Sequence, residues 1–114
     1  MKYLPLAAMV AALTLSACQQ RQAPTLTLPG QGPQQTSRLV YHCDDGTQLS
    51  VTYYNNDLNR LAVVAIPGQG EVVMANVIAA SGAKYDGNAF EWWTKGNSGT
   101  FSRLMDDKHT ECKI

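Results

Sequence analysis

The chain has 114 residues, and its nine Lys and Arg side chains balance nine Asp and Glu side chains, so the formal net charge is zero. This balance lacks the basic excess with which proteins bind nucleic-acid phosphates. The length fits one small folded domain.

The first 17 residues are typical of a secretory signal peptide. Lys2 supplies one basic charge, and residues 3–15 are uncharged and rich in Leu and Ala. This apolar stretch is shorter than the roughly 20 residues that a transmembrane helix needs. It ends in Leu15-Ser16-Ala17-Cys18, which places a cysteine where bacterial lipoprotein precursors are cleaved and lipidated.

Cys18 is therefore predicted to start the mature protein and to carry the lipid anchor. The alternative is an ordinary cleaved signal followed by a free cysteine, but an exported unpaired thiol would be a liability. Gln19, rather than an acidic residue, follows Cys18. In the lipoproteins that this pattern resembles, such a residue favours the outer membrane, where we expect the domain to face the periplasm.

Residues 18–37 comprise Cys18 and a segment rich in Gln, Pro and Gly without aromatic residues. Such a segment cannot bury enough apolar surface to offset its ordering entropy, so we expect a disordered tether. A flexible chain of this length spans roughly 25 Å. The folded domain is predicted to occupy residues 38–114.

The two remaining cysteines, Cys43 and Cys112, are predicted to form a disulfide. A domain of about 77 residues is near the size at which a hydrophobic core alone is marginal. An exported protein meets an oxidising compartment, where the bond is allowed. A zinc site is the competing interpretation, but two isolated cysteines without closely spaced partners are not a zinc pattern. No metal or other cofactor is expected.

Most of the domain alternates with a period of two, which predicts half-buried strands. Turn-forming residues separate the apolar runs at 44–46, 55–57, 67–70, 86–88 and 96–99. Residues 72–80 are apolar with little alternation, and their β-branched content favours a strand over a helical turn. Seven or eight short antiparallel strands in so short a domain predict an all-β small barrel or compact sandwich.

Enzymatic chemistry has little support in the sequence. Ser81 and Lys95 could be imagined as a nucleophile pair, but that would require a desolvated lysine, an oxyanion hole and a cleft. His42 and His109 are expected at the surface or rim. The adjacent pairs Asp44-Asp45 and Asp106-Asp107 are more typical of solvated turns than of a calcium loop.

Two segments instead favour protein recognition. Residues 79–87 and 90–96 combine small flexible residues, aromatic side chains and a lysine on neighbouring loops. Rigid aromatic anchors beside a positive tip suit a protein interface. The plainer interpretation is a hairpin with tryptophans in the core and an exposed lysine.

The chain resembles the C-type lysozyme inhibitor family of bacterial envelopes, the MliC/PliC group. The resemblance covers most of residues 38–114. It is carried by Tyr41-His42-Cys43-Asp44, Ala80-Ser81-Gly82-Ala83-Lys84-Tyr85, Trp92-Trp93-Thr94-Lys95-Gly96 and the late Cys112. The chain departs from the pattern at Lys84, where Arg is typical, and at Asn97-Ser98-Gly99, where acidic residues are expected.

The resemblance implies an eight-stranded antiparallel barrel with one disulfide, and a non-enzymatic protein that blocks the active-site cleft of a host C-type lysozyme. Ser81 and Lys95 would reach the two catalytic carboxylates. The implied lysozyme-contacting residues are Ser81, Gly82, Lys84, Tyr85, Trp93, Lys95 and Gly96. The alternative is a generic envelope module that binds another envelope protein or peptidoglycan. Neither nucleic acid nor a small-molecule substrate is an expected partner.

Overall fold

The computed structural model describes residues 26–114. The predicted signal peptide, the predicted lipid-bearing Cys18 and the first part of the predicted tether lie outside the described residues. Within the described part, no helix is long and apolar enough to cross a membrane.

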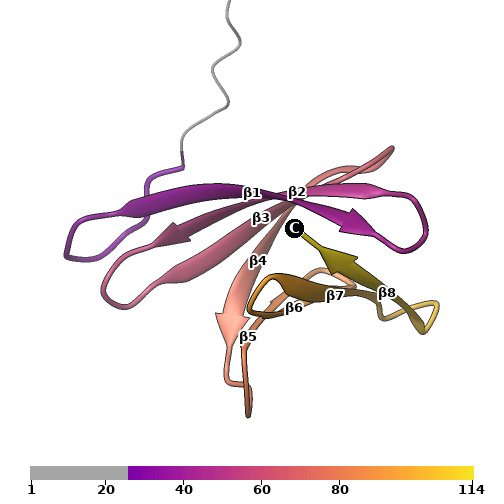
Figure 1. The fold of residues 1–114 in the computed structure, drawn as a ribbon. Helices are drawn as coiled ribbons and strands as arrows, with labels where there is room; N and C mark the ends of the chain where they lie inside the picture. The colour runs from indigo at the N-terminus through magenta and orange to yellow at the C-terminus, as the bar shows by residue number, and fades with distance from the viewer. Residues whose placement is uncertain (1–25) are drawn as a thin grey trace, which may run out of the picture.

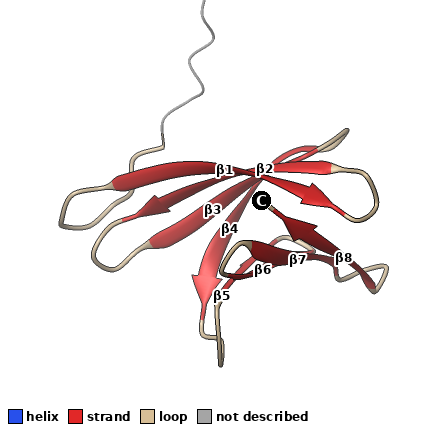
Figure 2. Cartoon of the chain, viewed as in Figure 1, coloured by secondary structure: helices blue, strands red, loops and turns tan. Residues whose placement is uncertain are grey.

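Eight strands form one closed antiparallel barrel, in which each strand pairs with the next and the last returns to the first (Figure 1). All regular structure in residues 26–114 is strand (Figure 2). The strands are β1 Gln35–Cys43, β2 Gln48–Asn55, β3 Arg60–Ile66, β4 Gly70–Val77, β5 Ala83–Gly87, β6 Phe90–Lys95, β7 Ser98–Arg103 and β8 Lys108–Lys113. The predicted eight-stranded barrel is confirmed, and so is the preference for a strand in residues 72–80, up to Val77.

The barrel closes through a short pairing that the disulfide reinforces. β1 and β8 share two register positions, His42 opposite Lys113 and Cys43 opposite Cys112. The second position carries the predicted disulfide, whose partners are 69 residues apart in sequence. The covalent bond therefore lies at one of the barrel's shortest strand contacts.

The barrel interior is filled by side chains that alternate along the strands. The fully buried ones include Tyr41, Val51, Val64, Met74 and Trp92. Their polar atoms are paired: the indole N–H of Trp92 donates to the Tyr53 hydroxyl at 2.8 Å, and the hydroxyls of Tyr53 and Tyr41 lie 2.9 Å apart. Trp92 also meets the Tyr41 ring edge to face, at a centroid distance of 4.8 Å. A buried network with paired polar atoms fixes one packing arrangement.

The turn predicted at residues 96–99 is shorter than expected. Only Gly96 and Asn97 form the turn, while Ser98 and Gly99 belong to β7. Gly99 is needed for packing, because a Cβ atom there would lie 2.4 Å from the Trp92 ring. The glycine thus makes room for a core tryptophan of the neighbouring strand.

The barrel begins earlier than the boundary predicted at residue 38. β1 starts at Gln35, which pairs with Asn55 of β2. Residues 26–34, here called the strap, fold against the β2–β3 loop. The Pro29 carbonyl accepts hydrogen bonds from the side-chain amides of Asn56, at 2.9 Å, and Asn59, at 2.8 Å. Leu28 of the strap is buried, so its apolar side chain is removed from water.

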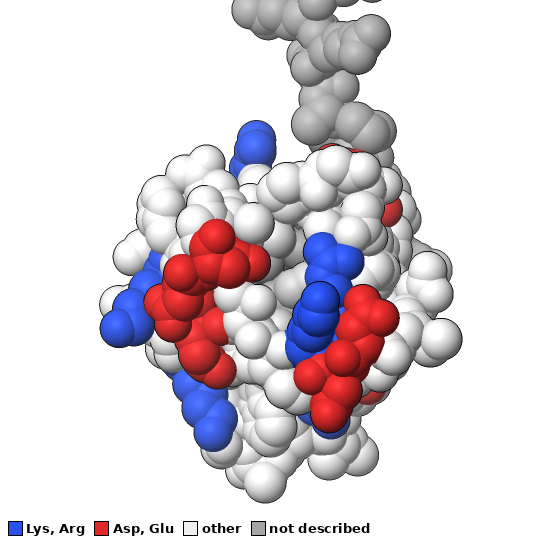
Figure 3. Space-filling model, turned by 90° about the vertical axis from the view of Figure 1, so that its right-hand side faces the viewer, with Lys and Arg blue, Asp and Glu red and all other residues white. Residues whose placement is uncertain are grey.

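Strand order divides the loops between the two ends of the barrel. The β2–β3, β4–β5 and β6–β7 connections lie at one end, here called the lysine end because it carries Lys95. The other four hairpins lie at the opposite end, which faces the viewer in Figure 3. Two groups of acidic side chains mark that face, one beside a short row of basic side chains. Its turns contain the exposed residues Asp44, Asp45, Asp106 and Asp107.

Candidate functional site

The predicted recognition residues gather at the lysine end on two adjacent connections. β5 pairs with β6 in a register that sets Ala83 opposite Thr94. The β4–β5 loop, residues 78–82, therefore lies beside the β6–β7 turn, residues 96 and 97. Ser81 is exposed on the loop, and Lys95 is exposed where β6 ends. Two residues fourteen positions apart in sequence are thus brought to one rim.

Trp93 joins the two connections. Its indole N–H donates a hydrogen bond of 2.8 Å to the backbone carbonyl of Ser81. The ammonium nitrogens of Lys95 and Lys84 lie 5.1 and 5.4 Å from the Trp93 ring centroid, within cation–π distance. Trp93 therefore restrains the serine loop and both lysines with the same side chain. Trp92 points into the core and Trp93 points outward, as strand alternation requires.

The two lysines differ in their electrostatic surroundings. Lys84 forms an ion pair of 3.3 Å with Glu91, a residue that sequence reasoning missed. Lys95 forms no ion pair within residues 26–114. Lys84 is already partly neutralised, so Lys95 is the one of these two lysines that is available to an acidic partner.

Two glycines set the shape of the rim. Gly82 has a φ of +67°, and a Cβ atom there would lie 2.2 Å from the Thr94 carbonyl oxygen. Only glycine allows the loop to approach β6 so closely. Gly96 has a φ of +57° with open space around it, so its role is confined to the turn geometry.

Tyr85 is the exception among the predicted contact residues. Its side chain faces the barrel interior with 5% of its surface exposed, and its ring lies 5.6 Å from that of Tyr53. Burial raises the pKa of its hydroxyl. The alternation of β5 turns Lys84 outward and Tyr85 inward, so Tyr85 supports the site from the core.

An arrangement of Ser, His and Asp side chains occurs on β7, on β8 and in the turn between them. The Ser102 hydroxyl lies 2.7 Å from Nδ1 of His109, whose Nε2 lies 3.3 Å from an Asp107 carboxylate oxygen. Ser102 is buried, with 3% of its surface exposed, so a substrate cannot reach its hydroxyl. A nucleophile needs an open site beside it. The hydrogen bond between Ser102 and His109 instead connects β7 and β8.

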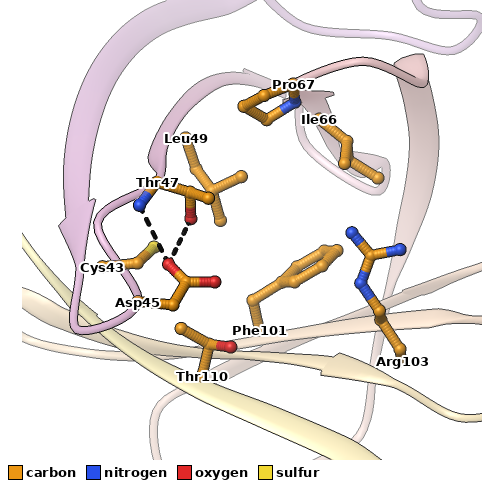
Figure 4. A pocket seen from close by; sticks show the side chains of 9 residues that line it. All are labelled: Cys43, Asp45, Thr47, Leu49, Ile66, Pro67, Phe101, Arg103 and Thr110. Atoms are coloured by element: carbon orange, nitrogen blue, oxygen red, sulfur yellow. Dashed lines mark hydrogen bonds between the residues drawn. The ribbon is translucent and has the colours of Figure 1, made fainter. Parts of the chain in front are cut away.

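A small cavity lies at the opposite end of the barrel (Figure 4). Its volume is about 50 Å³, and its lining includes Asp45, Phe101 and Arg103. Hydrogen bonds from the Thr47 side chain and backbone lower the pKa of Asp45. The cavity is far below the several hundred Å³ typical of ligand pockets. Within the described residues, no three His, Cys, Asp or Glu side chains cluster as metal ligands.

These geometric features coincide with a family match. Residues 41–110 fit the model of the family described as "Membrane-bound lysozyme-inhibitor of c-type lysozyme". The chain belongs to this family. The matched region runs from the end of β1 into β8 and contains the whole Ser81, Trp93 and Lys95 rim.

Individual relatives agree with this assignment. A membrane-bound lysozyme inhibitor of C-type lysozyme from Pseudomonas aeruginosa PAO1 is 42% identical over 82 residues, which cover 72% of this chain and 65% of the relative. A relative of the same description from Cupriavidus necator H16 is 48% identical over 65 residues, 57% of this chain and 51% of the relative. The matches thus span between half and two thirds of those proteins.

A solved structure also matches the barrel. It is the crystal structure of Pseudomonas aeruginosa MliC in complex with hen egg white lysozyme. The TM-score is 0.71 at 38% identity, and the alignment covers 83% of this chain and 98% of that one. The family fold therefore extends over nearly the entire described region.

Proposed function

We propose that this protein is an outer-membrane lipoprotein that inhibits C-type lysozyme competitively, without any enzymatic activity of its own. Cys18 carries the lipid and the barrel faces the periplasm. The lysine end enters the active-site cleft of the lysozyme, where Ser81 and Lys95 bind the two catalytic carboxyl groups.

The chemistry of the two partners is complementary. A lysozyme keeps one carboxylic acid protonated in an apolar pocket and a second carboxylate ionised. The Lys95 ammonium offers three N–H donors and a charge opposite to that of the ionised carboxylate. The Ser81 hydroxyl both donates and accepts, so it suits the carboxyl group whose protonation state changes. When both carboxyl groups are bound in this way, the sugar chain is excluded from the cleft. No covalent bond is broken in the process.

One observation carries this proposal: Trp93 restrains both the Ser81 backbone and the Lys95 ammonium, and it leaves both functional groups free. The Ser81 hydroxyl makes no hydrogen bond within residues 26–114, and Lys95 has no carboxylate partner there. A pre-positioned donor set loses little side-chain entropy on binding. The names of the relatives and the lysozyme-bound neighbour support the choice of partner.

Binding and inhibition assays test the proposal together. Purified protein should retain C-type lysozyme in a pull-down and should not be retained on purified cell wall. In a lysozyme assay it should raise the apparent KM for cell-wall substrate and leave kcat unchanged. Retention on cell wall without binding to lysozyme would favour the peptidoglycan-binding alternative and overturn the proposal.

The membrane anchor needs a separate test. Wild-type protein from labelled cells should incorporate palmitate and fractionate with the outer membrane. Cys18→Ala should lose the label and leave that fraction. Labelling that survives the substitution would contradict the predicted lipidation site.

A further inference from the structure

Ile78, at the start of the β4–β5 loop, is unusual among the apolar residues of the described chain. It directly follows the last residue of β4, three positions before Ser81. Ile78 is 99% exposed, the highest value among the large apolar residues that the structure describes. An isoleucine left in water forgoes the stabilisation that burial would give it. The folded monomer therefore gains nothing from an apolar side chain at this position.

The segment around Ile78 is held on both sides. The adjoining end of β4 pairs Val77 with Lys84 of β5, and the Asn76 side-chain amide donates a hydrogen bond of 3.1 Å to the Lys84 carbonyl. At the other end of the loop, the Trp93 N–H holds the Ser81 carbonyl, and Gly82 packs against the Thr94 carbonyl. A β-branched side chain has few χ1 rotamers. The loop thus presents a stiff apolar side chain at low entropic cost.

We infer that Ile78 is an apolar anchor of the same interface and that it contacts the hydrophobic wall beside the protonated catalytic acid of a C-type lysozyme. This inference rests on the proposed function. The general acid of such an enzyme lies in a hydrophobic pocket. The lysine end therefore offers one group of each required chemistry: a cation, a hydroxyl and an apolar side chain on neighbouring connections.

The chain contains a matched control for this inference. Met105 is 84% exposed in the turn between β7 and β8, at the opposite end of the barrel. It has a similar apolar surface but no connection to the Ser81 loop. A general loss of surface hydrophobicity would affect both positions alike, whereas a specific contact affects only Ile78.

The test measures lysozyme affinity and dissociation rate for wild type, Ile78→Ser, Ile78→Leu and Met105→Ser. Ile78→Ser should weaken binding by about tenfold or more, the change expected from losing a buried aliphatic side chain, mainly through faster dissociation. Ile78→Leu should retain most of the affinity, and Met105→Ser should retain all of it. The melting temperature should stay unchanged in every variant, because both positions are exposed.

The outcomes separate this inference from the proposed function. If wild type binds lysozyme and Lys95→Ala weakens binding, but Ile78→Ser binds like wild type, the anchor role is wrong and the proposed function stands. Equal losses in Ile78→Ser and Met105→Ser would also overturn the anchor role. If wild type itself does not bind lysozyme, the proposed function fails and the inference fails with it.

Discussion

The ammonium nitrogen of Lys95 lies 5.1 Å from the centroid of the Trp93 ring. Trp93 also donates its indole N–H to the Ser81 carbonyl, so the polar edge and the π face of one residue serve two separate connections. Cation–π contacts at exposed sites contribute about 0.5–1 kcal/mol, which restrains a lysine without neutralising it. The lysine charge therefore stays available for a carboxylate partner.

Replacing Lys95 by alanine should weaken binding to C-type lysozyme by about 2–5 kcal/mol, the range for truncating one partner of a buried charge pair. Titration calorimetry or surface plasmon resonance would measure the change. Lys108→Ala is the control, because Lys108 is an exposed lysine that begins β8 at the opposite end of the barrel. Binding unchanged by Lys95→Ala, with an intact circular dichroism spectrum, would refute the assigned role.

Replacing Trp93 by phenylalanine separates the two functions of the tryptophan. The variant keeps an aromatic face for the lysines and loses the N–H that holds the Ser81 carbonyl. That hydrogen bond is worth about 0.5–1.5 kcal/mol, so lysozyme affinity should fall by less than in Lys95→Ala. Trp93→Leu removes both interactions and should cost more. Equal affinities for wild type and both variants would show that the restraint plays no part in binding.

The disulfide prediction concerns stability. Removing Cys43 and Cys112 together, as a double alanine variant, should lower the free energy of unfolding by about 4 kcal/mol in the chain-entropy model. Urea unfolding with and without reductant measures this. Reductant should shift the wild-type midpoint and leave that of the double variant in place. Mass spectrometry that found both thiols free in protein from the envelope would contradict the bond.

The strap should contribute to stability through Leu28. Its side chain retains only 8% exposure, and full burial of a leucine stabilises by about 1.5–3 kcal/mol. Leu28→Ser should therefore lower the melting temperature, whereas Thr27→Ser, at the exposed neighbouring position, should not. A chain that begins at Gln35 should be destabilised at least as much as Leu28→Ser. Equal melting temperatures for wild type and Leu28→Ser would show that the strap is not part of the cooperative fold.

Alkaline pH should destabilise the barrel. Burial raises the pKa of Tyr53 above the usual value near 10, and the pKa of Tyr85 is raised for the same reason. Below pH 10 the neutral hydroxyl is retained in both the folded and the unfolded chain, so its stabilising contribution to the folded state is fully present. As the pH rises further, the unfolded chain releases the proton more easily than the folded chain does, and the free energy of unfolding falls. The urea midpoint should fall from about pH 10 upward. Tyr53→Phe should have lower stability at pH 7 and a smaller further loss at pH 11.

The sequence predicted the elements that depend on local patterns. Period-two alternation predicted strands, and turn residues marked most of their ends. Alternation alone did not say which member of the Trp92 and Trp93 pair faces the core, because it separates the two faces without choosing one. The family resemblance implied Trp93 as the contacting residue. The Ser98-Gly99 pair was predicted as part of a turn because its composition is that of a turn. The actual role of Gly99 depends on the Trp92 ring of the preceding strand.

Two other features depend on contacts between distant residues, which a single sequence does not reveal. The strap has a composition typical of disorder, but it is held by Asn56 and Asn59, about thirty residues later. Glu91 was missed because its pairing with Lys84 follows from the β5–β6 register. Tyr85 was named among the lysozyme-contacting residues because of its position in the family motif, whereas strand alternation turns its side chain into the barrel interior.

On the proposed route to the outer membrane, the short β1–β8 contact has a consequence for how the chain crosses the inner membrane. Secretion machinery threads an unfolded polypeptide, and the cytoplasm keeps thiols reduced. A newly made chain there lacks the covalent link at the position where Cys43 faces Cys112. On this proposed route, its tendency to fold before translocation is lower by the stability that the disulfide adds, and the disulfide forms only after translocation.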